Sequence, residues 1–318
     1  MTEITLTPAI ELAQQVKRKE ISAVELLELH LQRYRQHNPA INAVVFTQID
    51  YAYEQAQAAD KAVALGKTTG PLHGVPMTIK DSYDWIGSPS TWGMPEMIDN
   101  YPEVNAVAVQ RLLDAGAIIY GKSNVPLKLS DWQSFNEIYG VTNNPWDPTR
   151  TPGGSSGGAA AALATGMASL EIGSDIGASI RNPAHFCGVY GHKPTMGIVP
   201  LQGHLLPGDT AYHDISVGGP LARSAGDLKL ALDILAGPTG DLEKAWQFQL
   251  PPPRKNNLGE FKVGVLMESP VCVQDEQLTE QLLDTVATLE KAGVQTDRAA
   301  DPGFDWRRYQ EVYLLLLR

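Results

Sequence analysis

The sequence predicts an α/β fold in which helices flank a mixed, twisted β-sheet. Short apolar runs of strand length alternate with amphipathic helical stretches along the 318 residues. Turns rich in glycine and proline separate these segments. Hydrophobic residues make up 43% of the chain and charged residues 19%, a balance typical of globular proteins. We therefore expect a single globular domain over residues 1–318.

Composition limits the partners and the cellular location. The net charge of −11 disfavours nucleic acid and acidic lipid as partners. The two cysteines, Cys187 and Cys272, form neither a metal-binding spacing nor a disulfide framework, which fits a reducing cytoplasm. The N-terminal stretch lacks the apolar core of a secretory signal, and no run approaches the ~18 apolar residues of a membrane span. We expect a cytoplasmic protein.

Residues 1–66 predict a helical N-terminal part. Thr7 can cap a helix that has Pro8 at its first position. Ser22 and Glu25 form an S-x-x-E capping box, and apolar residues follow at helical spacing until Asn38-Pro39, which should stop that helix. Another helix is expected over about 51–65, ending at Gly66.

Residues 70–236 predict the core of the domain. A short apolar strand over 75–79 closes on Lys80-Asp81. A second strand, over 117–120, should give way to a loop at 121–124. The other elements expected here are helices over 104–115, 157–165 and 224–235 and a strand over 168–172.

Residues 237–318 predict the start of a C-terminal part. A proline-rich surface excursion over 237–257 precedes a strand over 261–267, a helix over 276–292 and a strand over 294–296. The last residues, YLLLLR, form an apolar helical pattern without a stop signal. An apolar helix of this kind is normally buried against other parts of a protein. We therefore interpret the chain as truncated within this part.

Two serine-bearing glycine turns carry the strongest chemical signal. They are GGSSGG at 153–158 and Gly177-Ala178-Ser179, separated by an alanine-rich stretch. Glycine lets the backbone approach a ligand closely, and a hydroxyl beside free N–H groups can attack a carbonyl and hold the resulting oxyanion. A flexible linker is the simpler reading of GGSSGG, but patterned segments flank it on both sides. Ser179 could equally cap the next short helix.

A serine nucleophile needs a base, and Lys80 is the best candidate because it ends an apolar strand. Burial can lower the pKa of a lysine from ~10.4 toward neutrality, since desolvation disfavours the charged form. Ser155 could pass a proton between Lys80 and Ser179. The ordinary alternatives are a lysine that reaches solvent from the surface and a hydroxyl that braces its own loop.

These residues lie in motifs that closely resemble the amidase signature family. The matching runs are GPLHGVPMTIKD around Lys80, GVTNNPWDPTRTPGGSSGG before the glycine loop and SDIGASIRNPAHFCGVYGHKPT after it. The resemblance spans nearly the whole chain. It implies the fold of that family, incomplete at its C-terminal end because members usually run well beyond 318 residues. It also implies a triad of Ser179 as nucleophile, Ser155 as a cis-peptide serine and Lys80 as base.

The resemblance implies further roles around the triad. Backbone amides of Ile176, Gly177, Ala178 and Ser179 would form the oxyanion hole. Supporting residues would be Ser156 and an ion pair between Asp175 and Arg181. The family usually has glycine where this chain has Ala178, and a Cβ there disfavours positive φ. The implied activity is hydrolysis of a small linear amide to an acid plus ammonia or an amine. The reaction would proceed through an acyl-enzyme and would need neither a cofactor nor a metal.

Other functions remain to be weighed. GGSSG also fits the G-x-S-x-G elbow of α/β-hydrolases with His185, His192 or His204 as base, although that motif requires a strand before the serine. GGSSGG does not fit the phosphate-loop pattern, because Gly158 is followed by alanine, and H-E-x-x-H does not occur in the sequence. The chain could instead be a catalytically impaired, truncated remnant or one subunit of an amidotransferase-like complex. As partners, a second copy in a homodimer and a partner subunit are both possible.

Four apolar residues are candidates for the wall of an acyl pocket, and ordinary core packing is the more common role for each. They are Trp85, Met94, Trp132 and Phe135.

Overall fold

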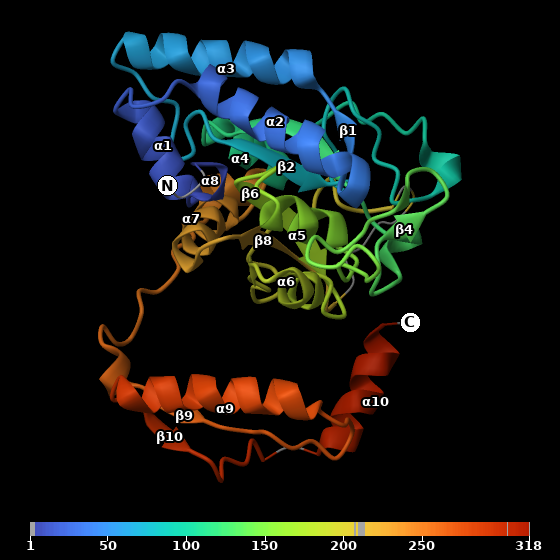
Figure 1. Cartoon of the computed structure of the whole chain (residues 1–318), viewed down its shortest axis with the longest axis vertical. Coiled ribbons are helices and arrows are strands. Elements are labelled where there is room, and N and C mark those ends of the chain that lie inside the picture. The colour runs from blue at the N-terminus through green and yellow to red at the C-terminus, as the bar shows by residue number, and fades with distance from the viewer. Residues whose placement is uncertain (1–3, 207, 209–213, 304, 318) are drawn as a thin grey trace. The chain divides into compact units, whose positions relative to one another are not determined.

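The computed structural model describes residues 4–206, 208, 214–303 and 305–317 and divides the chain into two compact units. The first unit covers Met1–Phe248 and the second Gln249–Arg318. The division between the two units falls inside the proline-rich segment 237–257 (Figure 1). The assignment of residues 1–318 to one domain stays a prediction.

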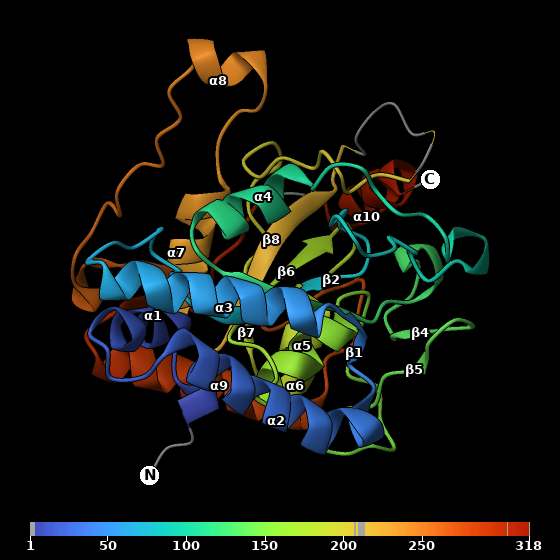
Figure 2. The same cartoon turned by 90° about the horizontal axis from the view of Figure 1, so that it is seen from above.

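The N-terminal part of the first unit is largely helical, as predicted. Its elements are η1 (Ile4–Leu6), α1 (Ala9–Lys17), α2 (Ala23–Ile41) and α3 (Ile49–Ala64). The capping box is confirmed: the Ser22 side chain accepts from the Glu25 amide, and the Glu25 carboxylate accepts from the Ser22 amide. Helices α2 and α3 lie side by side in both views (Figure 1, Figure 2).

The start of α1 corrects one prediction, because Thr7 does not cap this helix. Pro8 occupies the N-cap position and makes no side-chain cap bond. The carboxylate of Asp227 instead accepts hydrogen bonds from the amides of Ala9 and Ile10, at 3.0 and 2.9 Å. Helix α1 is therefore capped by a residue 218 positions away in the sequence, in the neighbouring helix α7 (Ala225–Leu235).

A second correction concerns the end of α2, which continues past Asn38-Pro39 to Ile41. Proline lacks an amide hydrogen, so the helix loses one backbone hydrogen bond at residue 39, and it ends two residues later. The Asn38 side chain accepts from the amides of Ala43 and Val44 and so shapes the exit of the chain. Strand β1 (Val44–Thr47) then follows, inside a region that the sequence analysis assigned to helices.

Two three-stranded sheets form the centre of the first unit. In the first, β1 pairs antiparallel with β3 (Ile118–Ser123), and β3 pairs parallel with β2 (Pro76–Lys80). In the second, β8 (Val217–Ala222) pairs antiparallel with both β6 (Leu170–Asp175) and β7 (Tyr190–Gly191). Strands β2 and β6 lie against each other, so the two sheets meet there. The mixed α/β architecture predicted from the sequence is confirmed.

Strand β3 is longer than predicted, because the segment 121–123 was assigned to a loop. Lys122 lies in the strand, fully buried, and its Nζ donates to the carbonyl of Pro89 at 2.7 Å and to the Ser90 hydroxyl at 3.2 Å. The carboxylate of Asp81 lies 4.0 Å away. These partners satisfy the charged end and allow a polar segment to continue the strand.

Helix α5 (Gly157–Ala164) explains the alanine-rich run. It contacts strands β1, β2, β3, β6 and β8, and its residues 157–163 are buried. A helix that is surrounded on all sides must be apolar all round, and small side chains let the strands approach closely. Gly158 shows the limit of this packing, because a Cβ built there would lie 2.3 Å from the Asn124 amide nitrogen.

The remaining elements of the first unit are short or peripheral. Helix α7 (Ala225–Leu235) is capped by Ser224, as predicted, through a hydrogen bond from the Asp227 amide. The others are η2 (Pro95–Met97), α4 (Val107–Asp114), η3 (Leu127–Leu129), β4 (Phe135–Asn136), β5 (Gly140–Val141), α6 (Arg181–Cys187), α7 (Ala225–Leu235) and α8 (Asp241–Ala245).

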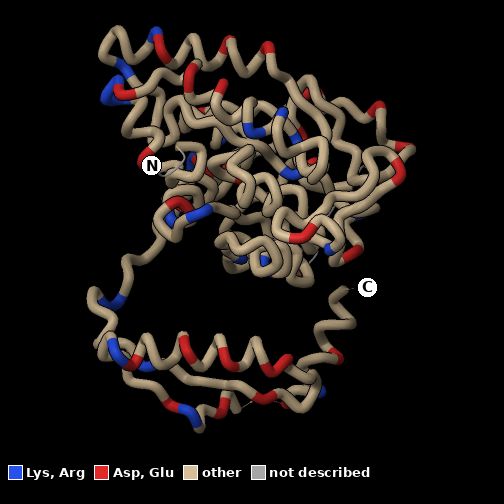
Figure 3. The backbone as a smooth tube through the Cα atoms, in the orientation of Figure 1, with Lys and Arg blue, Asp and Glu red and all other residues tan. Residues whose placement is uncertain are grey.

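The second unit has the predicted strand–helix–strand order. Strand β9 (Lys262–Gly264) pairs parallel with β10 (Gln295–Asp297), and α9 (Glu276–Lys291) connects them. η4 (Leu258–Glu260) precedes β9, and α10 (Trp306–Leu316) follows β10. Acidic and basic residues both occur along helices such as α3 and α9 (Figure 3). Among the described helices, none is long and apolar enough to cross a membrane.

The buried cap of α1 gives the first prediction. Asp227→Ala removes both hydrogen bonds to the first turn of α1, so the free energy of unfolding should fall by about 1–3 kcal/mol in urea titrations. Asp233→Ala is the matched control on the same helix, because Asp233 makes an exposed pair with Lys229. The control should change stability by less than about 0.5 kcal/mol. Equal losses in both variants would contradict the role of Asp227.

Candidate active site

Lys80 is the centre of a buried cluster of hydroxyl groups. It is the last residue of β2, and its side chain is fully buried. Its Nζ lies 2.7 Å from the Ser155 Oγ and 3.0 Å from the Ser174 Oγ, and the Ser174 carbonyl lies at 3.5 Å. The apolar strand before Lys80 explains its position, because five consecutive buried residues carry the amine into the interior.

The electrostatic surroundings of Lys80 bring its pKa close to neutrality. Burial is the largest effect and lowers the pKa of Lys80 to about 7, because the charged form loses its hydration. The carboxyl groups of Asp175 and Glu171 oppose this shift and keep the pKa from falling further. At pH 7 the amine can therefore both accept and release a proton.

The glycine loop brings Ser155 to this amine. The Gly154–Ser155 peptide bond is cis, as the family resemblance implied for this serine. Glycine is required at 154, where a Cβ would lie 2.4 Å from the Gln133 carbonyl oxygen. Ser156 donates through its hydroxyl to the Ser174 carbonyl at 3.4 Å. The loop thus packs directly onto the end of β6.

A second turn, at residues 176–180, carries Ser179 and follows β6. The amide of Ser156 donates to the carbonyl of Ser179 at 3.1 Å, which places the two serine turns against each other. Ser179 is 5% exposed, and Ser155 is 1% exposed. The structure therefore brings Lys80, Ser155 and Ser179 into one region, at the ends of two neighbouring strands.

Asp175 organises the nucleophile turn. Its carboxylate accepts from the amides of Ala178, Ile180 and Arg181 at 2.9, 3.0 and 3.3 Å. The Arg181 guanidinium donates to both carboxylate oxygens, so the predicted ion pair is present. Burial alone would raise the pKa of Asp175, but the Arg181 guanidinium and the amides of Ile180 and Ala178 hold it below its ordinary value.

One amide of the predicted oxyanion hole already has a partner within the chain. The Ala178 amide already donates to Asp175, so in this structure it is not free for a substrate oxygen. For the amides of Ile176, Gly177 and Ser179, no hydrogen-bond partner is present within the described parts of the chain. Ala178 also has a φ of 78°, the left-handed conformation that a Cβ disfavours.

Sequence analysis missed two polar residues beside Lys80. Ser174 contacts the amine directly. Glu171 is fully buried on β6 and accepts from the Thr78 hydroxyl at 2.5 Å, and burial raises its pKa to about 8. A signal for Glu171 was available in the sequence, because it is the only charged residue in the largely apolar run MASLEIG.

The four candidate pocket residues lie in different environments. Trp85 is a core residue whose ring packs edge-on against Tyr51 with centroids 6.2 Å apart, and Met94 is buried as well. Phe135 lies on β4, opposite Val141 of β5. Trp132 lies beside the nucleophile turn, because its indole Nε1 donates to the Gly177 carbonyl at 2.6 Å.

The structure disfavours the competing readings of the glycine loop. The residues before Ser155 form no strand, which the α/β-hydrolase elbow requires. His185 is exposed on α6, and His204 is buried with its ring nitrogen 3.0 Å from the Ser82 hydroxyl. Within the described residues, no group of three His, Cys, Asp or Glu side chains is arranged to hold a metal ion.

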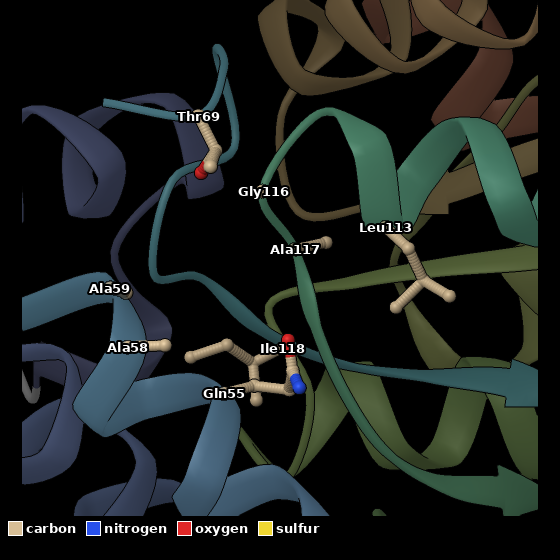
Figure 4. Close-up of a pocket in the computed structure, with 8 residues that line it drawn as sticks. All are labelled: Gln55, Ala58, Ala59, Thr69, Leu113, Gly116, Ala117 and Ile118. Atoms are coloured by element: carbon tan, nitrogen blue, oxygen red, sulfur yellow. The ribbon is translucent and has the colours of Figure 1, made fainter. Parts of the chain in front are cut away.

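A small cavity of about 110 Å³ lies away from this cluster (Figure 4). Its walls come from α3, from the loop around Thr69 and from the start of β3, including Gln55 and Ile118. It contains no charged group, and its lining includes none of the residues around Lys80.

The chain was compared with families and curated proteins. The family model described as Amidase matches residues 25–308. The indoleacetamide hydrolase of Bradyrhizobium diazoefficiens is 36% identical over 308 residues, which cover 96% of this chain and 58% of that protein. A glutamyl-tRNA(Gln) amidotransferase subunit from Acidothermus cellulolyticus is 34% identical over 312 residues, which cover 96% of this chain and 61% of that protein.

A solved structure of a related enzyme has a similar fold. A bacterial aryl acylamidase of the amidase signature enzymes is 26% identical with a TM-score of 0.85, covering 98% of this chain and 64% of that one. The chain thus spans between 58 and 64% of the length of these three proteins.

The buried amines give the second prediction. In spectra of the protein with labelled lysine, the NMR signal of Lys80 should titrate with a pKa of about 7 and that of Lys122 with a pKa of about 8, because burial lowers both. The variant Lys80→Met should remove the lower transition and leave the higher one. If every lysine signal titrates near the ordinary value of ~10.4, the electrostatic description of the site is wrong.

Proposed function

This chain belongs to the amidase family, and from that premise we propose that it hydrolyses linear amides with Ser179 as nucleophile, Ser155 as proton relay and Lys80 as base. The observation that carries the proposal is the 2.7 Å hydrogen bond between the Lys80 amine and the Ser155 hydroxyl. Because burial lowers the pKa of Lys80 to about 7, a large fraction of the amine is neutral at physiological pH. A neutral amine can take the proton that the relay delivers.

The first half of the reaction forms an acyl-enzyme. The Ser179 Oγ attacks the amide carbonyl carbon while its proton passes to the Ser155 Oγ, and the Ser155 proton passes to the Lys80 Nζ. The carbonyl electron pair moves onto oxygen, where the amides of Ile176, Gly177 and Ser179 stabilise the negative charge. The proton then returns from Lys80 through Ser155 to the leaving nitrogen, the C–N bond breaks, and ammonia or amine departs.

The second half restores the enzyme. Water gives a proton to the same relay and attacks the ester carbonyl of the acyl-enzyme. The second tetrahedral intermediate collapses, Ser179 regains its proton, and the carboxylic acid is released. The relay ends each half-reaction in its starting protonation state, so the proposal needs neither a metal ion nor a cofactor.

Supporting roles follow from the contacts around the triad. Ser156 holds the glycine loop on β6, and the pair of Asp175 and Arg181 braces the nucleophile turn. We also propose that the substrate is a small amide. We propose a cytoplasmic location as well, because both cysteines are free, as is usual in a reducing compartment. Partner subunits are a second option, since one relative is part of a glutamyl-tRNA(Gln) amidotransferase. The activity of the whole protein remains part of this proposal, because the chain spans only part of its relatives.

The third prediction tests the nucleophile. Purified protein should release ammonia or amine from at least one member of a panel of aliphatic, aromatic and amino-acid amides, and Ser179→Ala should reduce kcat by at least about 10³-fold. A fluorophosphonate should label Ser179 in the unmodified protein. Equal product release by both proteins would refute the assignment. A folded protein with neither turnover nor labelling would support the impaired remnant or the dependence on partner subunits.

The fourth prediction tests the base through pH. Because only the neutral amine accepts the proton, kcat/KM should rise with pH, by about tenfold per unit below pH 7, and level off above the pKa of Lys80 near 7. Lys80→Ala should abolish the turnover that this limb describes. His185→Ala is the control, and it should retain activity because His185 is exposed on α6. Loss of activity in His185→Ala with retention in Lys80→Ala would favour the α/β-hydrolase mechanism.

A further inference from the structure

We propose that Trp132 is a positioning residue that fixes the oxyanion-binding turn, through its indole N–H on the Gly177 carbonyl. The inference rests on the proposed function, because it assigns a role within the same site. The carrying observation is the 2.6 Å hydrogen bond from the Trp132 Nε1 to the Gly177 oxygen. This bond joins two segments that lie 45 residues apart in the sequence.

The hydrogen bond completes the restraint of a single peptide unit. The Gly177–Ala178 peptide has its carbonyl held by Trp132 and its N–H held by the Asp175 carboxylate at 2.9 Å. A peptide group is planar, so fixing both ends fixes its orientation. This unit lies between the amides of Gly177 and Ser179, which we assign to the oxyanion hole. Their directions therefore depend on it.

The restraint matters because Ala178 has an unfavourable backbone conformation. Its φ of 78° lies in the left-handed region, where the Cβ of an L-residue is crowded. An unrestrained turn can relieve this crowding by rotating the neighbouring peptide unit. The two hydrogen bonds to that peptide oppose this rotation. Trp132 thus supplies support that a glycine at 178 would need less.

The segment that carries Trp132 is itself attached to the first serine turn. Two residues further on, the Ser134 hydroxyl donates to the Gly153 carbonyl and accepts from the Gly157 amide, each at 3.1 Å. The segment 132–134 therefore contacts both turns, the glycine loop through Ser134 and the nucleophile turn through Trp132. It can set the position of one turn relative to the other.

Exposure separates this role from ordinary packing. Trp132 is 61% exposed, so most of its ring contributes little to a hydrophobic core. Trp146 offers a matched control: it is 74% exposed, and its indole Nε1 also donates to a backbone carbonyl, that of Cys187, at 2.9 Å. The two tryptophans differ in their acceptors, because only one of these carbonyls belongs to the turn of Ser179.

The fifth prediction compares Trp132→Phe with Trp146→Phe. Trp132→Phe keeps an aromatic ring and removes the donor, so kcat should fall by about tenfold, and KM should change by less than about twofold. The rate of fluorophosphonate labelling of Ser179 should fall in parallel, and the midpoint of the pH profile should stay unchanged. Trp146→Phe should retain the kcat of the unmodified protein. A Trp132→Phe variant with unchanged kcat overturns the proposal, as does an equal loss in both variants.

A second measurement does not depend on activity. Hydrogen exchange of the amides in residues 176–181 should be faster in Trp132→Phe than in Trp146→Phe, while the unfolding midpoints of the two variants stay similar. Unchanged exchange in this segment overturns the inference even if no amide is hydrolysed. If exchange accelerates but the unmodified protein neither turns over amides nor labels at Ser179, the positioning role stands and the proposed function fails.

The pair of Trp132 and Ala178 provides the last arm of the test. In the Ala178→Gly background, Trp132→Phe should reduce kcat by a smaller factor than in the unmodified chain, because glycine adopts positive φ without the crowding of a Cβ. A reduction of the same size in both backgrounds would show that Trp132 does not act through the conformation of residue 178.

Discussion

The burial of one amine is the constraint on which the site depends. Moving the Lys80 side chain out of water disfavours its charged form, and the change from 10.5 to a pKa of about 7 corresponds to roughly 5 kcal/mol of differential interaction. This is the net change: burial alone would lower the pKa further, and the carboxyl groups of Asp175 and Glu171 oppose it. With a pKa near 7, the amine can accept a proton and release it again at neutral pH. A reaction in which one group first takes up a proton and then returns it requires such a pKa.

Small residues make that burial possible. Helix α5 packs closely on strands of both sheets because its residues are glycine, alanine and one leucine. Larger residues would push the helix away from β2 and β6, the strands that carry Lys80 and Asp175 at their ends. The glycine loop before α5 is held by the same close packing. The glycine loop resembles a flexible linker when its sequence is considered alone. Its small residues are explained by how closely the loop and α5 pack on the strands.

The sequence predicted local features well and long-range ones poorly. The capping box of Ser22 and the buried strand that ends at Lys80 depend on neighbouring residues, so their patterns are visible in the sequence. The cap of α1 by Asp227 depends on a contact between segments more than 200 residues apart. Lys122 was placed in a loop because a strand with a buried lysine needs partners, here Pro89 and Ser90, that no local pattern reveals.

The turn that carries Ser179 shows why the hydrogen bonding of its amides could not be predicted from the sequence. The spacing of Ile176, Gly177 and Ala178 suggests that every amide of the turn faces the substrate, but a turn must also hold its own shape. Asp175 uses the amides of Ala178, Ile180 and Arg181 for that purpose. A carboxylate so close to a developing oxyanion would oppose it, and the Arg181 guanidinium offsets that charge. The pair of Asp175 and Arg181 therefore shapes the turn, and it also reduces the repulsion between the Asp175 carboxylate and the proposed oxyanion.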